Sequence, residues 1–421
     1  MARSTGETPP GLSSRPNLER NVETIFLRWT FVRAVFHRGY VLVATLYFVV
    51  GAHLSASQLV FLGTAVSVTL ALSDIPTGVW SDVISRKWPL VIGHTFMAAG
   101  MVMTGFVTAF PLLLITQALW GLGWAFSNGA DVAWLADELD RPDRIDRVLT
   151  ASARWSLFGG ATGMVAFGVL GWASNLATAI VLSGASMAVV GIFVAVRFSE
   201  HNFTRTQARR WTASLSIFRR GLALASHDHE ILLVFAATMI INGASMTAWL
   251  FPKRLVILGF PHDPVLWWTA IGILSSGVGA IALHIVEARI DGVGVARRTY
   301  ALACFIGLLG MLVLAYAPDF LVGGVGVLLT SGIAFNVTRP VSVIWVNRRT
   351  TSDVRATVHS CLSQAESIGE IFGGVAFAFL ATAADIPVAL VAAGALIAFT
   401  GAMVARSRGD RASDGTRISD E

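Results

Sequence analysis

Residues 58–87 read QLVFLGTAVSVTLALSDIPTGVWSDVISRK, an apolar run followed by a short charged loop. The run carries no charge before Asp74, near its far end. A helix of roughly 20 apolar residues is long enough to cross the ~30 Å hydrocarbon core of a bilayer. We therefore expect 58–79 to span a membrane and the charged loop to lie at its surface.

Composition extends this interpretation to the whole chain. Of its 421 residues, 54% are hydrophobic and 14% are charged, with a mean hydropathy of +0.66. A soluble domain needs more polar surface than that. We predict an all-α membrane protein of 12 transmembrane helices at residues 39–55, 58–79, 88–108, 112–136, 149–172, 175–196, 229–250, 266–286, 298–316, 320–346, 356–380 and 384–405.

Basic residues set the expected orientation. Of 31 Lys and Arg, only Lys253 and Arg254 fall in loops assigned to the outside, so both termini are expected in the cytoplasm. The predicted parts are a cytoplasmic amino-terminal segment (1–38), a six-helix bundle (39–196), a cytoplasmic linker with an amphipathic helix at 209–225 (197–228), a second six-helix bundle (229–405) and a cytoplasmic tail (406–421).

A faint internal repeat suggests that the two bundles are pseudo-symmetric. Spans five and eleven each carry two small residues four positions apart, which let helices approach closely in lipid. The matches are Asn128, Arg147 and Ser152 with Asn336, Arg355 and Ser360, each 208 positions later, and Gly159 and Gly163 with Gly369 and Gly373.

The loop after span two resembles the signature loop of the major facilitator superfamily, G-x-x-x-D-R-x-G-R-[RK]. Gly78, Asp82, Arg86 and Lys87 match that pattern, whereas Val83 and Ser85 replace the expected Arg and Gly. Three further segments resemble one bacterial branch of the superfamily: the acidic-x-P-T-G lead-in Asp74-Ile-Pro-Thr-Gly78, the stretch from Ser127 through Asp131 to Asp137, and Arg355-Ala-Thr-Val.

This resemblance implies a secondary transporter with a gate in the loop after span two. Gly78 is expected to allow close helix packing and Asp82 to cap span eleven, where the helix dipole favours an anion. Arg86 is expected to reach Asp137, and Asp74 and Lys87 to belong to the same gate.

Two other family patterns are altered in this chain. Gln117 stands where antiporters usually carry the Arg of R-x-x-x-G, four residues before Gly121. Span five keeps its glycines but lacks the proline of the drug antiporters. Trp120 and Trp124, one turn apart on span four, and Gln117 on the same span are candidates for substrate contact, because that span lines the cavity in this superfamily.

Ionisable residues inside spans mark functional sites, since each costs about 2.5–3.5 kcal/mol on insertion scales. We predict one ion pair in each half, Asp131 with Arg154 and Arg339 with Glu366. The alternative joins Asp131 to Arg339. Glu366 and Glu370 share a helix face and are the candidate proton carriers.

Together these features predict proton-coupled efflux of a small apolar compound. The alternatives are an uptake symporter or facilitator, and a membrane receptor that transports nothing. Neither of the two lysines, Lys87 and Lys253, follows G-x-x-x-x-G, so we expect no ATPase, no enzyme, no metal and no cofactor beyond a proton gradient.

The setting follows from composition. An excess of 29 Arg over two Lys suggests a GC-rich bacterial genome. We expect a monomer that crosses the bacterial cytoplasmic membrane many times. Its partners would be a small-molecule substrate and lipid, with no nucleic acid.

Overall fold

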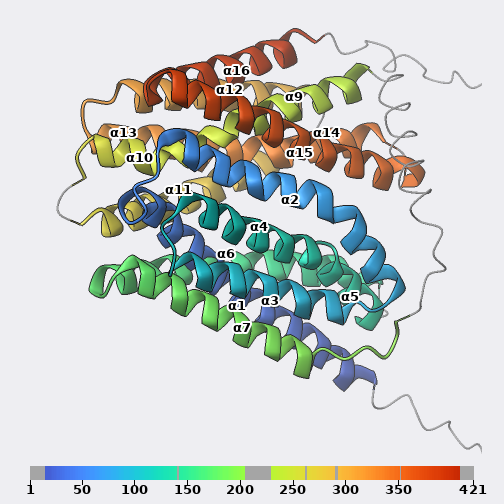
Figure 1. Ribbon diagram of the computed structural model, residues 1–421. Coiled ribbons are helices and arrows are strands. Elements are labelled where there is room, and N and C mark those ends of the chain that lie inside the picture. The colour runs from blue at the N-terminus through green and yellow to red at the C-terminus, as the bar shows by residue number, and fades with distance from the viewer. Residues whose placement is uncertain are drawn as a thin grey trace, which may run out of the picture. The chain divides into compact units, whose positions relative to one another are not determined.

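The computed structural model describes residues 15–139, 142–203, 229–260, 263–289, 293–350 and 352–407. Within these ranges every regular element is a helix (Figure 1). The amphipathic helix predicted at 209–225 lies outside the described residues. Packing divides the chain into two units, residues 1–47 with 72–209 and residues 48–71 with 210–421.

The helices before the central linker follow the predicted spans except the first. Here α3 packs against both α4 and α7. Gly129, at φ +79°, separates α4 from α5 within predicted span four. The helices are α1 (Arg15–Val50), α2 (Ala56–Val83), α3 (Lys87–Thr104), α4 (Phe110–Ser127), α5 (Ala130–Leu139), α6 (Pro142–Ala173) and α7 (Leu176–Arg197).

The helices after the linker contain two irregular turns. A 3₁₀ turn, η1, joins α9 to α10, and a π-helical turn, η2, joins α13 to α14. The elements are α9 (His229–Ser245), η1 (Met246–Leu250), α10 (Phe251–Ile257), α11 (Pro264–Glu287), α12 (Val293–Tyr316), α13 (Phe320–Val327), η2 (Leu328–Ala334), α14 (Phe335–Arg349), α15 (Ser352–Ala383) and α16 (Ile386–Arg406).

Eleven helical segments of the described chain are long and apolar enough to cross a membrane. They overlap every predicted span but the third, and the first only over residues 39–50. That one corresponds to α3, an 18-residue helix with Lys87 at its start and buried His94 within it. A membrane-spanning protein is therefore supported, while the number twelve stays a prediction.

The predicted start of the first span was wrong. We expected it at residue 39, but α1 begins at Arg15 and its membrane-length segment runs from Asn21 to Val50. Charged residues in this stretch lowered the apparent hydropathy. In the structure some of them have partners, such as Glu23, whose Oε1 lies 2.7 Å from Arg144 Nη2.

The placement of Lys253 and Arg254 in an outer loop was also wrong. Both lie in α10, which continues α9 through η1. Arg254 donates from Nε to the Leu314 carbonyl at 3.1 Å and from Nη2 to the Ala315 carbonyl at 2.7 Å. Because the last carbonyls of a helix lack intrahelical partners, these bonds cap α12.

Residues 48–71 belong with the second unit because they pack against its helices. Lys253 Nζ donates to the Leu54 carbonyl, and the indole of Trp249 lies directly over Gly63. Any Cβ at Gly63 would overlap that indole. The first half of α2 therefore packs on η1 and α10.

The small-residue pairs pack alike in both units. A Cβ added at Gly159 or Gly163 on α6 would overlap the backbone of Phe31 or Val35 on α1. Added at Gly369 or Gly373 on α15, it would overlap the backbone of Met239 or Gly243 on α9. In each unit the fifth span thus lies against the first at backbone contact, as the repeat indicated.

We expect Gly163→Ala to destabilise the protein and Gly277→Ala to leave it as stable or slightly more so. The first Cβ has no room beside Val35, and overpacking of this kind costs about 1–3 kcal/mol. The second meets nothing within 4 Å, and Ala favours a helix over Gly by about 1 kcal/mol. Thermal unfolding of the purified variants in detergent measures both. Equal midpoints would contradict the proposed packing.

Candidate functional site

Arg86 lies between two carboxylates at the junction of α2 and α3. Its guanidinium contacts Asp82, one turn earlier on α2, and donates from Nε to Asp137 Oδ2 at 3.1 Å. All three side chains are largely buried. The contact between Arg86 and Asp137 was predicted, while the role of this cluster as a gate and the capping of span eleven by Asp82 stay predictions.

Glu200, which follows α7, was missed by the sequence reasoning. It accepts hydrogen bonds from the backbone N–H of Arg86 at 2.5 Å and of Lys87 at 2.9 Å, and from Ser85 Oγ at 2.7 Å. An anion at a helix N-terminus is favoured by the exposed N–H groups and the helix dipole. Glu200 therefore fixes the start of α3 and with it the backbone of the signature loop.

The structure gives a different account of Gly78 and Asp74. A Cβ at Gly78 would meet nothing within 4 Å, so the close packing predicted for this glycine was wrong in this conformation. Asp74 Oδ1 is buried and lacks a hydrogen-bond partner among the described residues. A buried acceptor without a partner is unusual in a protein interior.

Asp131 pairs with Arg33, and the predicted partner Arg154 was wrong. Asp131 Oδ2 lies 3.5 Å from Arg33 Nη1, with the two side chains 16% and 18% exposed. Arg154 is exposed and has no ion-pair partner among the described residues. Arg33 was missed because α1 begins earlier than expected.

Arg33 belongs to an aromatic cluster formed by α1 and α4. Its guanidinium lies 4.3 Å from the ring centroid of Trp29 and 5.4 Å from that of Trp124, within cation–π range. His37 stacks on Trp124 at 4.8 Å and on Trp120 at 5.4 Å between ring centroids. The two tryptophans that we predicted as substrate contacts thus stack on a histidine that we did not predict.

Two buried nitrogens of this cluster are unsatisfied. His37 Nε2 and Trp120 Nε1 have no hydrogen-bond partner among the described residues. Each unpaired buried polar group costs about 1–3 kcal/mol. The cluster therefore has two polar groups that no described residue satisfies.

Gln117 takes part in a buried hydrogen-bond network. Its Nε2 donates to Tyr40 Oη at 3.0 Å, and Tyr40 Oη lies 3.2 Å from Thr104 Oγ1. Thr104 in turn donates to Thr116 at 2.9 Å. With 2% of its surface exposed, Gln117 ties α4 to α1 and α3 in this conformation.

The second unit contains the predicted pair of Arg339 and Glu366. Arg339 donates from Nε and Nη2 to the two carboxylate oxygens of Glu366 at 3.1 and 2.9 Å. This bidentate geometry is the strong form of an Arg–carboxylate contact. It joins α14 to α15.

Glu370 lies one turn further along α15 and is bound differently. It accepts a hydrogen bond from Ser67 Oγ on α2 at 2.8 Å. No cation lies within ion-pair distance of it among the described residues. The contact with Ser67 was not predicted, because nothing in the sequence connects two residues 303 positions apart.

A small polar hollow of about 90 Å³ opens beside Arg339. Hydroxyl and amide side chains of α9 and α14 line it. They are Thr238, Asn242, Ser245, Thr338 and Ser342.

We expect Asp131→Arg to reduce the yield of monodisperse protein, and Arg33→Asp in addition to restore part of it. Breaking a buried pair leaves an uncompensated charge that costs roughly 3–5 kcal/mol, less here because the pair is partly exposed. Size-exclusion chromatography of the purified variants measures the yield. Rescue by Arg154→Asp rather than Arg33→Asp would contradict the observed pairing.

The fold matches solved transporters along most of the chain. The nucleoside transporter NupG superimposes with a TM-score of 0.76 at 14% identity, covering 92% of this chain and 100% of that one. A bacterial homologue of the human lysosomal transporter Spinster, inward-facing and occupied, gives 0.70 at 12% identity, covering 95% and 97%. A POT family transporter in complex with 5-aminolevulinic acid gives 0.69 at 11% identity, covering 92% and 95%.

Sequence comparison gives the family. No curated protein matches the chain as a whole. A family model matches residues 30–374, well over half of the chain, and this stretch includes the signature loop and both intramembrane ion pairs. The chain belongs to the Major Facilitator Superfamily and is a multi-pass transmembrane transporter.

Proposed function

We propose that the protein is a secondary active transporter that exports a small, largely apolar compound in exchange for protons. Alternating access to a central site moves the compound across the bacterial cytoplasmic membrane. The observation that carries the coupling is the contrast between Glu366 and Glu370, two carboxylates one turn apart in a membrane-length helix.

Glu370 is the proposed proton carrier. Glu366 is neutralised by the bidentate contact with Arg339, whereas Glu370 has a serine hydroxyl as its bonding partner. A carboxylate without a counter-charge in a membrane span is costly. Binding a proton removes that charge, and releasing it on the other side returns the site to its starting state.

The hydrogen bond to Ser67 connects this carrier to α2. An ionised carboxylate only accepts hydrogen bonds, whereas a protonated one has a proton to donate. Protonation of Glu370 therefore changes the bond between α15 and α2. Since Asp82 lies in the last turn of α2 and contacts Arg86, a change in this bond acts on the same helix that carries part of the proposed gate.

The gate proposal rests on the cluster around Arg86. Its contacts with Asp82 and Asp137 join the end of α2 to α5. Two such charge-assisted bonds hold the junction in one arrangement. Their release is the step proposed to accompany the change of access.

The aromatic cluster of α1 and α4 supports an apolar, flat substrate. Trp120 and Trp124 are half-buried, so part of each ring remains open. The unpaired nitrogens of His37 and Trp120 add the few directional contacts that orient a ligand in an otherwise apolar site.

The polar hollow beside Arg339 favours a second candidate, uptake of a polar compound by symport or facilitation. Its hydroxyl and amide lining is suited to binding hydrogen-bonding groups. Similar solved structures include a nucleoside transporter and a peptide transporter. Export and uptake differ in the direction in which a proton gradient drives the substrate.

We expect Glu370→Gln to abolish gradient-driven transport while leaving substrate binding intact. The amide keeps the bond to Ser67 but cannot exchange a proton. The measurement is flux in proteoliposomes with an imposed pH gradient, using flat apolar fluorescent compounds beside a nucleoside panel. Gradient-driven flux is expected to fall to the level of protein-free liposomes, because the amide at this position cannot bind and release a proton.

The control is Glu287→Gln, which removes an exposed carboxylate at the end of α11 and should transport normally. Wild-type flux that ignores the gradient would contradict proton coupling. Accumulation of nucleosides rather than apolar compounds would establish the uptake alternative. Binding without any flux would indicate a receptor.

A further inference from the structure

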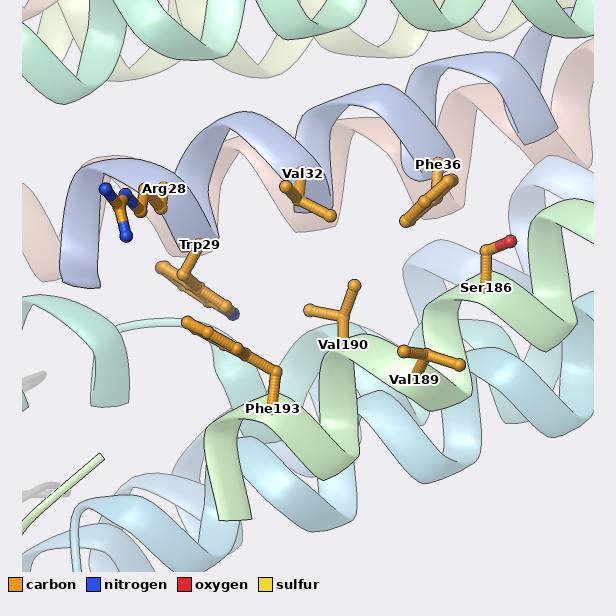
Figure 2. Close-up of a pocket in the computed structure, with 8 residues that line it drawn as sticks. All are labelled: Arg28, Trp29, Val32, Phe36, Ser186, Val189, Val190 and Phe193. Atoms are coloured by element: carbon orange, nitrogen blue, oxygen red, sulfur yellow. The ribbon is translucent and has the colours of Figure 1, made fainter. Parts of the chain in front are cut away.

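The first unit contains a hollow between α1 and α7 to which the proposed transport mechanism assigns no role. It has a volume of about 430 Å³ and is shown in Figure 2. This volume lies within the range of roughly 300–1,000 Å³ typical of ligand sites. Eight residues line it: Arg28, Trp29, Val32, Phe36, Ser186, Val189, Val190 and Phe193.

Apart from its two ends the hollow is apolar. Val32, Phe36, Val189 and Val190 form its middle, with Ser186 at one end and Arg28 at the other (Figure 2). Trp29 donates its ring N–H to His94 at 3.2 Å, so it offers the hollow only ring carbons. The lining therefore suits a hydrocarbon chain.

The hollow opens on a surface that is itself apolar. Leu182, Val189, Ile192 and Val196 lie on one face of α7 and are 45–73% exposed. Both α1 and α7 are long and apolar enough to span a membrane. An exposed apolar face on such a helix lies against lipid. The occupant that reaches this hollow most directly is an acyl chain.

Arg28 gives the hollow a charged end at the depth of lipid headgroups. The membrane-length part of α1 has 30 residues, about 45 Å at 1.5 Å per residue, which exceeds the ~30 Å hydrocarbon core. Residue 28 stands seven positions from its start, so the exposed guanidinium reaches the interface. It has no ion-pair partner among the described residues. Arg197, at the end of α7, lies one turn beyond Phe193 and is also exposed.

A second hollow on the other side of α7 provides the contrast. It has a volume of about 390 Å³, lies between α3 and α7, and is lined by apolar residues and Thr95 without any charged side chain. The two hollows are similar in size and in apolar character. Only the first combines a chain-like groove with a cation at headgroup depth.

We propose that the groove between α1 and α7 is a binding site for one anionic phospholipid. An acyl chain lies along Val32, Phe36 and Val189, and the phosphate is bound by Arg28. A guanidinium is suited to this because it donates to a phosphate in a planar, bidentate geometry. The chain also fills a void that would otherwise deprive both helices of dispersion contacts.

The test is native mass spectrometry of the delipidated full-length protein titrated with dioleoyl phosphatidylglycerol or dioleoyl phosphatidylcholine. The two lipids share their chains and phosphate, but only the first carries net negative charge. We expect one phosphatidylglycerol bound roughly tenfold or more tightly than phosphatidylcholine, about 1.4 kcal/mol, because the choline cation beside the phosphate of phosphatidylcholine opposes the guanidinium. Arg28→Gln should bring the two affinities within about twofold of each other.

Two matched pairs of variants separate the groove from general lipid contact. Val189→Trp fills the groove and should remove the tight site, whereas Ile192→Trp fills the uncharged hollow and should not. Arg289→Gln, which removes an exposed arginine in the other unit, should leave the preference for phosphatidylglycerol unchanged.

Equal affinity of the wild type for both lipids would overturn the proposal and leave ordinary annular lipid. So would a preference that survives Arg28→Gln, or tight binding that survives Val189→Trp. A monodisperse elution profile of each variant shows that the variant is folded, so that any loss of lipid binding is not caused by misfolding.

Discussion

A charge inside a membrane-spanning helix is costly, and the contacts that pair such charges within the protein join helices of this structure. Arg33 pairs with Asp131, Arg339 pairs with Glu366, and Arg254 caps the carbonyls of Leu314 and Ala315. Each contact joins two helices of the same unit, so satisfying the charges also fixes the packing. Glu370 differs, because a neutral hydroxyl is its bonding partner. A carboxylate without an ion-pair partner in a span is costly, so binding a proton there relieves that cost.

Hydropathy predicted most of the fold because lipid imposes a minimum length on every span. It misplaced the start of α1, because a hydropathy average counts every charged residue as unfavourable, whether or not that residue has a partner in the fold. Arg33 lowers the hydropathy of its stretch, yet its contacts with Trp29 and Asp131 allow it to lie inside. The buried residues Val22, Ile25, Phe26 and Trp29 recur at helical spacing and were the available signal for an earlier start. That signal comes from one face of the helix, and an average of hydropathy over a window of sequence does not distinguish the faces.

The candidate site was predictable only where local spacing determines the neighbour. Residues at similar depth in neighbouring antiparallel helices were predicted to form ion pairs. This argument was right for Arg339 and Glu366 and wrong for Asp131 and Arg154. Depth does not say which helix face a side chain occupies, and the true partner of Asp131 lay on a helix whose start had been misplaced. Glu200 and Ser67 were beyond reach for another reason. Each is a single polar residue that acts on a segment more than a hundred positions away.

The internal repeat separates what is architectural from what is functional. Phe31 and Val35 in the first unit and Met239 and Gly243 in the second stand 208 positions apart and pack against corresponding glycine pairs. The backbone contacts of the two halves are thus equivalent. Asp131 and Arg339 are also 208 positions apart, but they carry opposite charges and find partners on α1 and on α15. The shared fold needs the equivalent backbone contacts but not equivalent charges. We therefore interpret the charge difference as a difference in function between the two halves. The half with the arginine also holds Glu370, which has no ion-pair partner among the described residues, so we place the proposed proton coupling there and the proposed substrate contacts in the aromatic cluster of the other half.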